Sequence, residues 1–260
     1  MNIVFIGTSS GRTSLSRFHS SILFEHNKFG LLIDAGDGAA KALLAADKNY
    51  NDINFILFTH YHADHFGGIG ALITQMKIYG RKKTLKIITN KGLKSPLIKF
   101  LNSCYMFLND LGFELIIIET EIDDEIKLAK DFSFRLRKNR HIQKKSGIDF
   151  IDEPKFISSS ILFNYKGKHI FYTADVGSDK DLEIFNDFSI DLLIAESTHL
   201  SLKSISDFAV KSKIKYVYLT HIDEPDEKEI ISSAKKMNKG KSFAVEAAFD
   251  GMTINVTDEF

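Results

Sequence analysis

Cysteine is almost absent from this chain, which carries only Cys104 among its 260 residues. A single cysteine cannot form an intramolecular disulfide, and this excludes a small scaffold held together by disulfide bonds. The apolar residues from Leu97 to Leu111 follow helical spacing around Cys104. We therefore expect its thiol to lie in the hydrophobic core.

Proline is scarce, with three residues, and no segment rich in proline, glycine or serine interrupts the sequence. No domain boundary is indicated, and the length suits one domain over 1–260 with a full hydrophobic core. Long hydrophobic runs are also missing, since no segment approaches the roughly 20 apolar residues that span a bilayer. The first residues lack the charged and apolar regions of a secretory signal. We expect a cytoplasmic protein with no membrane partner.

An excess of charge of either sign is missing as well. Lysine and arginine together number 34, as do aspartate and glutamate, which gives a formal net charge of zero. This balance excludes an overall field that would attract the protein to nucleic acid or to an anionic membrane. Any affinity for a polyanion must therefore be local.

What the sequence does contain is a succession of short apolar runs rich in Ile, Val, Phe and Leu. Segments with helical periodicity separate many of these runs, which is typical of an α/β protein. The predicted strands are 2–6, 21–25, 30–34, 53–58, 85–89, 113–118, 132–137, 158–165, 168–173, 191–195, 215–219, 242–245 and 252–256. The predicted helices are 38–46, 67–78, 93–110, 179–186, 203–211 and 226–237.

Several predicted strands end in polar residues that could take part in chemistry. Two of them, NFILFTH and KYVYLTH, stop at Thr-His and so end at His60 and His221. Others end at Asp34 and Asp175, and one ends at Glu196. Because ligands of open α/β sheets collect at the carboxyl ends of strands, we expect these residues to point toward one edge.

The segment FTHYHADHFGG, residues 58–68, concentrates four potential metal ligands in six positions. His60 and His62 are two residues apart, so in extended backbone both imidazoles can face the same point. Asp64 and His65 follow after the chain begins to turn, which aims them at a neighbouring point. The spacing therefore favours two adjacent metal ions over a solvated cluster of surface histidines.

The sequence THYHADHFGG resembles the HxHxDH signature of the metallo-β-lactamase fold. This resemblance implies a four-layer αββα sandwich of the α/β class, with a two-zinc site along one edge. It also implies three later ligands in a fixed order, namely a histidine, a bridging aspartate and a final histidine. Asp175 and His221 match the last two. For the first we favour His141, because His169 would lie on the strand of Asp175 and roughly 20 Å from it, at about 3.3 Å per residue.

The resemblance divides these residues between two metal ions that share one carboxylate. The sets are His60, His62 and His141 for one ion, Asp64, His65 and His221 for the other, and Asp175 for both. Such ligands suit zinc, and manganese and iron are alternatives because protein ligands alone rarely settle metal identity. Two metals about 3.5–4 Å apart can hold a bridging hydroxide, polarise an electrophile and stabilise a leaving oxygen, which is hydrolytic chemistry.

Outside the ligands, the chain is similar to the ribonuclease Z and cyclic-phosphodiesterase branch of that superfamily. The similarity lies in the order of FIGTSSG, SSILFE, LLIDAGDG, LLIAEST and AAFDGMTINV along the sequence. In that branch a histidine that binds no metal, oriented by an acidic residue, is thought to protonate the leaving oxygen. His199 matches this position and Glu196 would orient it, although His199 abuts the Glu-Ser-Thr segment without the usual loop. The alternative for His199 is a surface histidine beside a helix. Asp64 is also assigned to orienting the hydroxide.

A second difference between this sequence and that branch bears on the substrate. Its tRNA-processing members carry a long arm between the third ligand motif and the bridging aspartate. Only 34 positions separate His141 from Asp175, and two predicted strands lie among them, so we expect no arm. The basic run at 135–145 is interpreted mainly as an exposed strand edge and loop, with phosphate attraction as the alternative.

We therefore expect a dinuclear phosphodiesterase that hydrolyses a small cyclic phosphodiester, such as a cyclic nucleotide, through a metal-bridging hydroxide. One alternative is a tRNA 3′-processing endonuclease that lacks the usual arm. A lactonase or β-lactamase and a catalytically idle nucleotide-binding module are further alternatives. The complete ligand set argues against the idle module. The resemblance also implies a homodimer.

Overall fold

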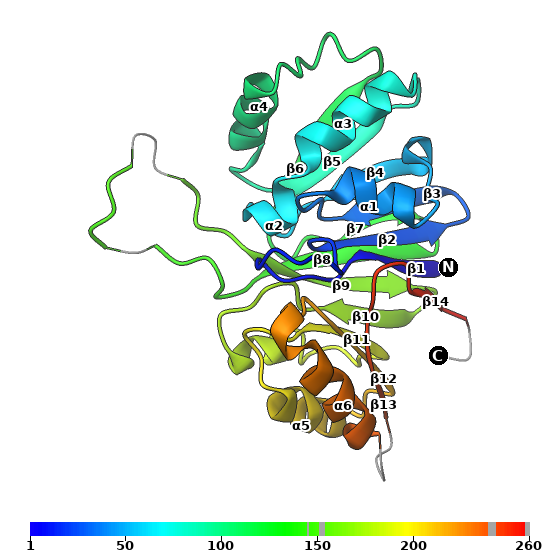
Figure 1. The fold of residues 1–260 in the computed structure, drawn as a ribbon, viewed down its shortest axis with the longest axis vertical. Coiled ribbons are helices and arrows are strands. Elements are labelled where there is room, and N and C mark those ends of the chain that lie inside the picture. The colour runs from blue at the N-terminus through cyan, green and yellow to red at the C-terminus, as the bar shows by residue number, and fades with distance from the viewer. Residues whose placement is uncertain (145, 151–153, 239–242, 258–260) are drawn as a thin grey trace.

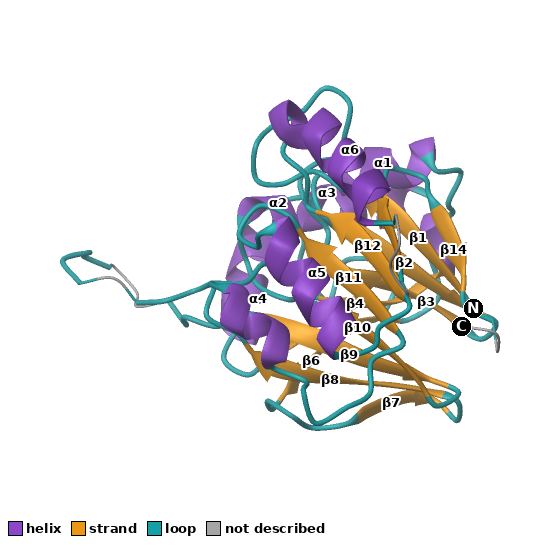
Figure 2. Cartoon of the chain, turned by 90° about the horizontal axis from the view of Figure 1, so that it is seen from below, coloured by secondary structure: helices purple, strands orange, loops and turns teal. Residues whose placement is uncertain are grey.

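Two seven-stranded β-sheets pack face to face, and helices cover their outer faces (Figures 1 and 2). This computed structural model describes residues 1–144, 146–150, 154–238 and 243–257. In Figure 1 the helices α1, α3 and α4 lie in the upper half and α5 and α6 in the lower half. The order of layers is therefore αββα, which confirms the predicted fold class.

The first sheet has the strand order β14-β1-β2-β3-β4-β5-β6. Its strands are Asn2–Gly7 (β1), Ser21–His26 (β2), Phe29–Ile33 (β3), Ile53–Leu57 (β4), Leu85–Asn90 (β5), Leu115–Thr120 (β6) and Thr253–Asn255 (β14). The second sheet has the order β13-β12-β11-β10-β9-β8-β7. Its strands are Ile126–Ala129 (β7), Phe132–Lys138 (β8), Ser159–Tyr165 (β9), Lys168–Tyr172 (β10), Leu192–Glu196 (β11), Tyr216–Thr220 (β12) and Ala244–Ala247 (β13).

Each sheet has a parallel half and an antiparallel half. Strands β3 to β6 pair in parallel in the first sheet, as do β10 to β13 in the second. Strands β8 and β10 both pair antiparallel with β9, so they point in the same direction. The carboxyl ends of β8, β10, β11 and β12 therefore lie along the same edge of the second sheet.

The helices are short and each buries one apolar face. They are Ala39–Ala45 (α1), Ala63–Phe66 (α2), Ile69–Ile78 (α3), Lys94–Ser103 (α4), Leu202–Lys211 (α5) and Glu227–Met237 (α6). Three 3₁₀ turns are Tyr50–Asp52 (η1), Asp179–Glu183 (η2) and Glu224–Asp226 (η3). Within the described ranges, no helix has the length and apolar character needed to cross a bilayer.

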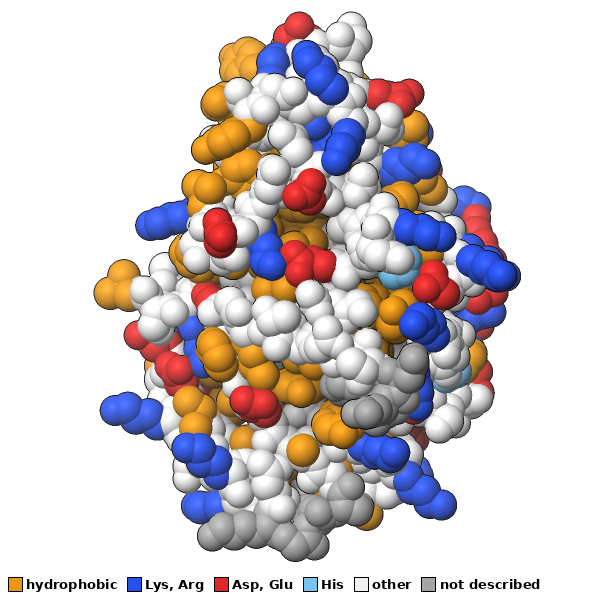
Figure 3. All heavy atoms as spheres, turned by 90° about the vertical axis from the view of Figure 1, so that its right-hand side faces the viewer, with side chains coloured by type: hydrophobic (Ala, Val, Ile, Leu, Met, Phe, Trp, Pro, Cys, Tyr) orange, Lys and Arg blue, Asp and Glu red, His pale blue; other side chains and the backbone are white. Residues whose placement is uncertain are grey.

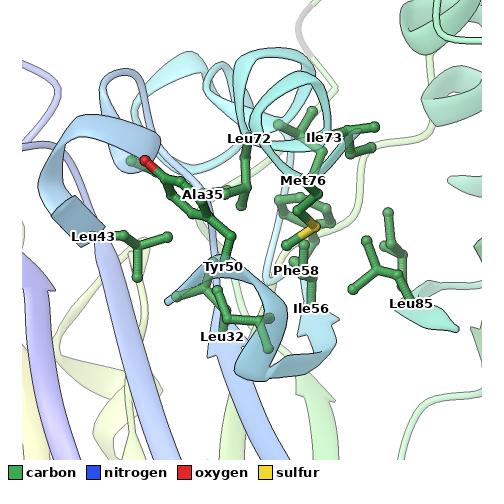
Figure 4. Packing of buried hydrophobic residues seen from close by; sticks show 14 of the residues in the cluster. Leu32, Ala35, Leu43, Tyr50, Ile56, Phe58, Leu72, Ile73, Met76 and Leu85 are labelled. Atoms are coloured by element: carbon green, nitrogen blue, oxygen red, sulfur yellow. The ribbon is translucent and has the colours of Figure 1, made fainter. Parts of the chain in front are cut away.

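Three apolar layers hold the sandwich together. The layer between the sheets includes Phe24 of β2 and Phe163 of β9, whose ring centroids are 4.4 Å apart. A second layer lies under α1, α3 and α4, and Figure 4 shows Met76 of α3 close to Ile56 and Phe58. A third layer lies under α5 and α6. Strands β3 and β11 are buried along their whole length, which explains their continuous apolar sequences.

Each predicted strand has a counterpart in the described residues, although position 242 of the predicted strand 242–245 lies outside them, and the main errors concern β7 and two helices. Strand β7 was not predicted, because its four residues are only partly buried and give no apolar run. The helix predicted at 93–110 ends at Ser103, since Tyr105 adopts a left-handed backbone with φ of 58°. Cys104 caps that helix and is exposed, so the prediction of a core position was wrong. The predicted helix 179–186 is the shorter turn η2.

A loop between β8 and β9 projects from the body of the molecule (Figures 1 and 2, at the left). Its described residues form no helix or strand between His141 and Ser159. The expectation that no arm would fit between the third ligand and Asp175 was therefore wrong. Strands β9 and β10 begin only at Ser159, so the segment between His141 and β9 is left free and extends outward.

Replacing Phe163 by alanine tests the layer between the sheets. We expect the free energy of unfolding to fall by about 3–5 kcal/mol, because a buried aromatic ring would be replaced by a cavity. Chemical denaturation followed by circular dichroism measures this loss. The matched control is Phe249→Ala, since Phe249 is 54% exposed. An equal loss in both variants would contradict the assignment of Phe163 to the inter-sheet core.

Candidate metal centre

Polar side chains from both sheets meet at one edge of the sandwich. The segment 60–65 follows β4 of the first sheet and continues into α2. His141, Asp175 and His221 follow β8, β10 and β12 of the second sheet. The structure thus brings together all seven residues that the sequence analysis assigned to metal binding, and their ligand atoms form two groups.

The first group consists of His60, His62, His141 and Asp175, with all ligand atoms within 4.8 Å of one another. His141 Nε2 lies 3.0 Å from His62 Nδ1 and 3.5 Å from Asp175 Oδ2. Burial holds the pKa of His60 well below its ordinary value and lowers the pKa of His141 to about 4. These imidazoles stay neutral at pH 7, which is the form that binds a cation.

The second group consists of Asp64, His65, Asp175 and His221, again within 4.8 Å. His221 Nε2 lies 3.2 Å from both Asp64 Oδ2 and Asp175 Oδ1. His65 Nε2 lies 3.0 Å from Asp175 Oδ1. Burial opposes ionisation of both carboxyl groups, but the facing histidines outweigh it. The pKa of Asp64 falls to about 2, and that of Asp175 lies well below its ordinary value.

The Asp175 carboxylate belongs to both groups, because its two oxygens face different histidines. Oδ2 faces His141, and Oδ1 faces His65 and His221. His60 Nε2, His65 Nε2 and Asp175 Oδ1 are buried, and none of them makes a hydrogen bond of good geometry with a described residue, although the last two lie 3.0 Å apart. Leaving such an atom unsatisfied costs about 1–3 kcal/mol. Cations bound to the two groups would satisfy all three atoms, so the donor set fits a dinuclear metal centre.

The backbone turns sharply where the strands deliver these side chains. Asp34, Ala174 and His221 adopt left-handed backbone conformations, with φ of 60°, 48° and 55°. Non-glycine residues adopt this conformation at a cost of about 1–3 kcal/mol each, and such residues cluster at functional sites. The turns let β10 and β12 end abruptly, so that Asp175 and His221 enter the cluster and do not continue along the sheet.

A buried carboxylate, Asp34, supports the centre from the first sheet. Its Oδ2 lies 2.7 Å from His65 Nδ1, and its Oδ1 accepts a hydrogen bond from the Thr59 backbone N–H at 2.8 Å. His65 therefore directs its other nitrogen toward Asp175. Gly36 allows this close packing, because a Cβ atom at that position would lie 2.2 Å from a backbone oxygen of α2. The sequence analysis noted Asp34 only as a polar strand end.

Asn139 joins the ends of β8 and β10. Its Nδ2 donates to the Asp175 carbonyl oxygen at 2.9 Å, and its Oδ1 accepts from the His141 backbone N–H at 3.2 Å. The side chain is buried, so these bonds fix two potential ligands relative to each other. Sequence reasoning missed Asn139, since an asparagine within a basic segment gives no distinctive signal.

His199 and Glu196 lie beside the second group. His199 Nδ1 is 3.1 Å from Glu196 Oε1, and Glu196 is fully buried. The hydrogen bond to Glu196 raises the pKa of His199 above its ordinary value. The His199 ring is partly exposed, with its centroid 5.0 Å from that of His141. Glu196 therefore orients a half-buried imidazole that can carry a proton at neutral pH.

The two groups form the floor of an open pocket of about 390 Å³. Its wall adds residues that sequence reasoning did not assign, Ser10, Arg12, Thr198 and Asp223 among them. Arg12 Nε lies 3.7 Å from Asp223 Oδ2, and Ser10 Oγ donates to the other oxygen of Asp223. Arg12 is the only lysine or arginine that lines this pocket among the described residues. Arg12 could not be recognised from the sequence, because its partner Asp223 is far away along the chain.

The described lysines and arginines of the basic run at 135–145 do not line this pocket, although His141 within that range does. Arg137 is bound to Asp187, and Arg140 Nη1 lies 3.0 Å from an aspartate oxygen. Lys145 is outside the described residues. These ion pairs favour the interpretation of an exposed strand edge and loop over phosphate attraction.

Comparison with known proteins places this site in a family. A family model described as "Anti-Pycsar protein Apyc1" matches residues 1–242. Ribonuclease Z of Sulfurisphaera tokodaii is 27% identical, covering 95% of this chain and 96% of the relative. The crystal structure of the short form of human tRNase Z superimposes with a TM-score of 0.73 at 19% identity, over 99% of this chain and 100% of that one. The metallo-β-lactamase fold protein YhfI from Bacillus subtilis gives a TM-score of 0.73 at 19% identity, over 97% and 98%.

Changing Asp34 to asparagine tests how the centre is supported. An amide has one accepting oxygen, so it cannot accept from the Thr59 backbone N–H on one side and from His65 Nδ1 and the Thr59 hydroxyl on the other, and His65 should lose its fixed orientation. We expect metal affinity to fall by about 10- to 100-fold, as for other residues that orient a ligand. Competition with a chromogenic chelator measures the change. Asp37→Asn is the control, since Asp37 is exposed, and equal affinity in both variants would contradict the role of Asp34.

Proposed function

Since the chain belongs to the family of the anti-Pycsar protein Apyc1 and is a metal-dependent hydrolase of the metallo-β-lactamase fold, we propose that it hydrolyses a small cyclic phosphodiester such as a cyclic nucleotide. One observation carries this proposal. Two groups of ligand atoms share the buried Asp175 carboxylate at the floor of a pocket that also holds a potential proton donor. We propose zinc for both groups, with manganese or iron as alternatives.

Seven residues would hold the two metal ions. They are His60, His62, Asp64, His65, His141, Asp175 and His221. When bound, the ions would lower the pKa of a water molecule and stabilise negative charge on the phosphoryl oxygens.

The remaining steps belong to the side chains around the metal ligands. Glu196 binds His199 Nδ1, so His199 Nε2 is the nitrogen available to the substrate. In the proposed mechanism, Nε2 donates a proton to the oxygen that leaves phosphorus. The raised pKa of His199 keeps the protonated form populated near neutral pH. Asp64 remains ionised and would orient the attacking water, while Arg12 on the pocket wall attracts the anionic substrate.

The size and charge of the site favour a small substrate. A pocket of about 390 Å³ is at the lower end of the range for small-molecule sites, about 300–1,000 Å³. The segment 142–158, which contains the projecting loop, has three lysines and three acidic residues in its sequence. A segment without net positive charge gains little from binding RNA phosphates. The face in Figure 3, which is turned away from the projecting loop, carries Lys and Arg interspersed with Asp and Glu.

A second candidate function is the processing of tRNA 3′ ends. The similarity to ribonuclease Z of Sulfurisphaera tokodaii over 95% of the chain favours it, as does the projecting loop itself. A homodimer, which the resemblance implies, is part of both proposals.

A panel of substrates separates these candidates. We expect kcat/KM to be highest for a cyclic mononucleotide, lower for bis(p-nitrophenyl) phosphate, and lowest for precursor tRNA and for a lactone. The physical reason is that the pocket accommodates one small anionic ester, while the segment 142–158 beside it has no net positive charge with which to bind an RNA. Precursor tRNA as the best substrate would contradict the first candidate and support the second.

Metal analysis tests the centre itself. We expect the purified holoprotein to contain close to two metal ions per chain by mass spectrometry of the digested sample. Asp175→Ala removes the shared carboxylate, so kcat/KM should fall by about 100-fold or more with loss of bound metal. Asp207→Ala is the control, because Asp207 lies on the exposed face of α5. A holoprotein free of metal, or full activity in Asp175→Ala, would overturn the proposed centre.

A further inference from the structure

Two threonine hydroxyls occupy matching places behind the two halves of the site. On the first sheet, the Thr59 hydroxyl donates to Asp34 Oδ2 at 2.8 Å and lies 3.0 Å from His60 Nδ1. The same Asp34 oxygen is 2.7 Å from His65 Nδ1. One buried carboxylate therefore holds one histidine directly and a second histidine through a threonine.

The second sheet repeats this arrangement with different residues. The Thr198 hydroxyl donates to Glu196 Oε2 at 2.9 Å and lies 2.8 Å from His221 Nδ1, with a longer contact of 3.2 Å to His199 Nδ1. The other oxygen of Glu196 is 3.1 Å from His199 Nδ1. Again a buried carboxylate binds one histidine directly, here His199, and a second one through a threonine.

The hydrogen-bonding capacity of these groups fixes the direction of each bond. An ionised carboxylate only accepts, and a hydroxyl has a single hydrogen, so that hydrogen goes to the carboxylate. The hydroxyl oxygen then accepts from the Nδ1–H of His60 or His221. Each imidazole is thereby kept in the tautomer whose Nε2 carries a lone pair. His60 Nε2 is buried and has no hydrogen-bond partner among the described residues, and His221 Nε2 faces Asp64 and Asp175.

We propose that Thr59 and Thr198 are matched positioning residues, each of which fixes the metal-binding tautomer of one histidine by connecting it to a buried carboxylate. This inference rests on the proposed function, since it assigns His60 and His221 to the metal ions. It goes beyond that function because it assigns each buried carboxylate to the support of two histidines. Asp34 supports His60 and His65 together, whereas Glu196 supports the last ligand, His221, together with the proton donor.

The two halves differ in what the directly bound histidine does. His65 is fully buried and its Nε2 faces Asp175, so it belongs to the second ligand group. The His199 side chain is 42% exposed and belongs to neither of the groups that share Asp175. On the first sheet, the carboxylate and the threonine therefore support two ligand histidines. On the second sheet, the same arrangement supports one ligand, His221, and one imidazole outside those two groups, that of His199.

Valine substitutions test this proposal because valine keeps the shape of threonine and removes the hydroxyl. We expect Thr59→Val and Thr198→Val to lose zinc affinity by about 10- to 100-fold, measured by chelator competition without substrate. Thr59→Ser and Thr198→Ser keep the hydroxyl and should retain the affinity of the unchanged protein. Thr253→Val, at an exposed position on β14, is the matched control.

Nitrogen-15 NMR of histidine in the unchanged zinc-loaded protein provides a second measurement that needs no variant. His60 and His221 should both carry hydrogen on Nδ1 and bind zinc through Nε2. The opposite tautomer at either histidine would overturn the proposal for its threonine. Equal zinc affinity in the valine variants and the unchanged protein would overturn it for both. If the unchanged protein binds no metal at all, the proposed function fails instead.

Discussion

The buried carboxylate of Asp175 is the group on which the rest of this structure depends. It is 2% exposed, and a carboxylate taken out of water is stable only when opposite charges or donors surround it. Those partners come from both sheets, since His65 follows β4 while His141 and His221 follow strands of the second sheet. The sandwich must therefore bring the carboxyl ends of strands from two sheets within a few ångströms of one point. The aromatic layer between the sheets, with Phe24 against Phe163, sets the spacing that makes this contact possible.

Much of the fold follows from the sequence because its central strands are buried on both faces. Such strands give continuous apolar runs, as in β3 and β11, and these were predicted with small errors at their ends. Strand β7 was missed because an edge strand of four partly buried residues produces no such run. The helix after position 93 was extended too far, because apolar spacing continues past Ser103 while the backbone at Tyr105 turns out of the helix.

The candidate site could be anticipated only where its residues are close in sequence or match a known signature. Within the segment 60–65, the spacing of the histidines and the aspartate is itself a signal for metal binding. The choice of His141 and Asp175 depended instead on the resemblance to the metallo-β-lactamase fold. Arg12 and Asn139 could not be found this way. Arg12 pairs with Asp223, more than 200 positions later, and Asn139 acts through backbone groups that no sequence pattern records. The projecting loop was missed because a count of positions does not show which way the chain leaves the body.

The two halves of the site also separate binding from proton transfer, and this follows from burial. His65 is completely enclosed, so its Nε2 has no access to water and can serve only the buried cluster. His199 is held by an equivalent carboxylate but is partly exposed at the pocket wall, where Nε2 can reach a substrate. An imidazole that binds a cation through Nε2 could not also donate a proton from that nitrogen, since its lone pair would be occupied and it would carry no hydrogen. Keeping one of the four carboxylate-supported histidines out of the ligand groups therefore provides a proton donor without changing the way its neighbours are oriented.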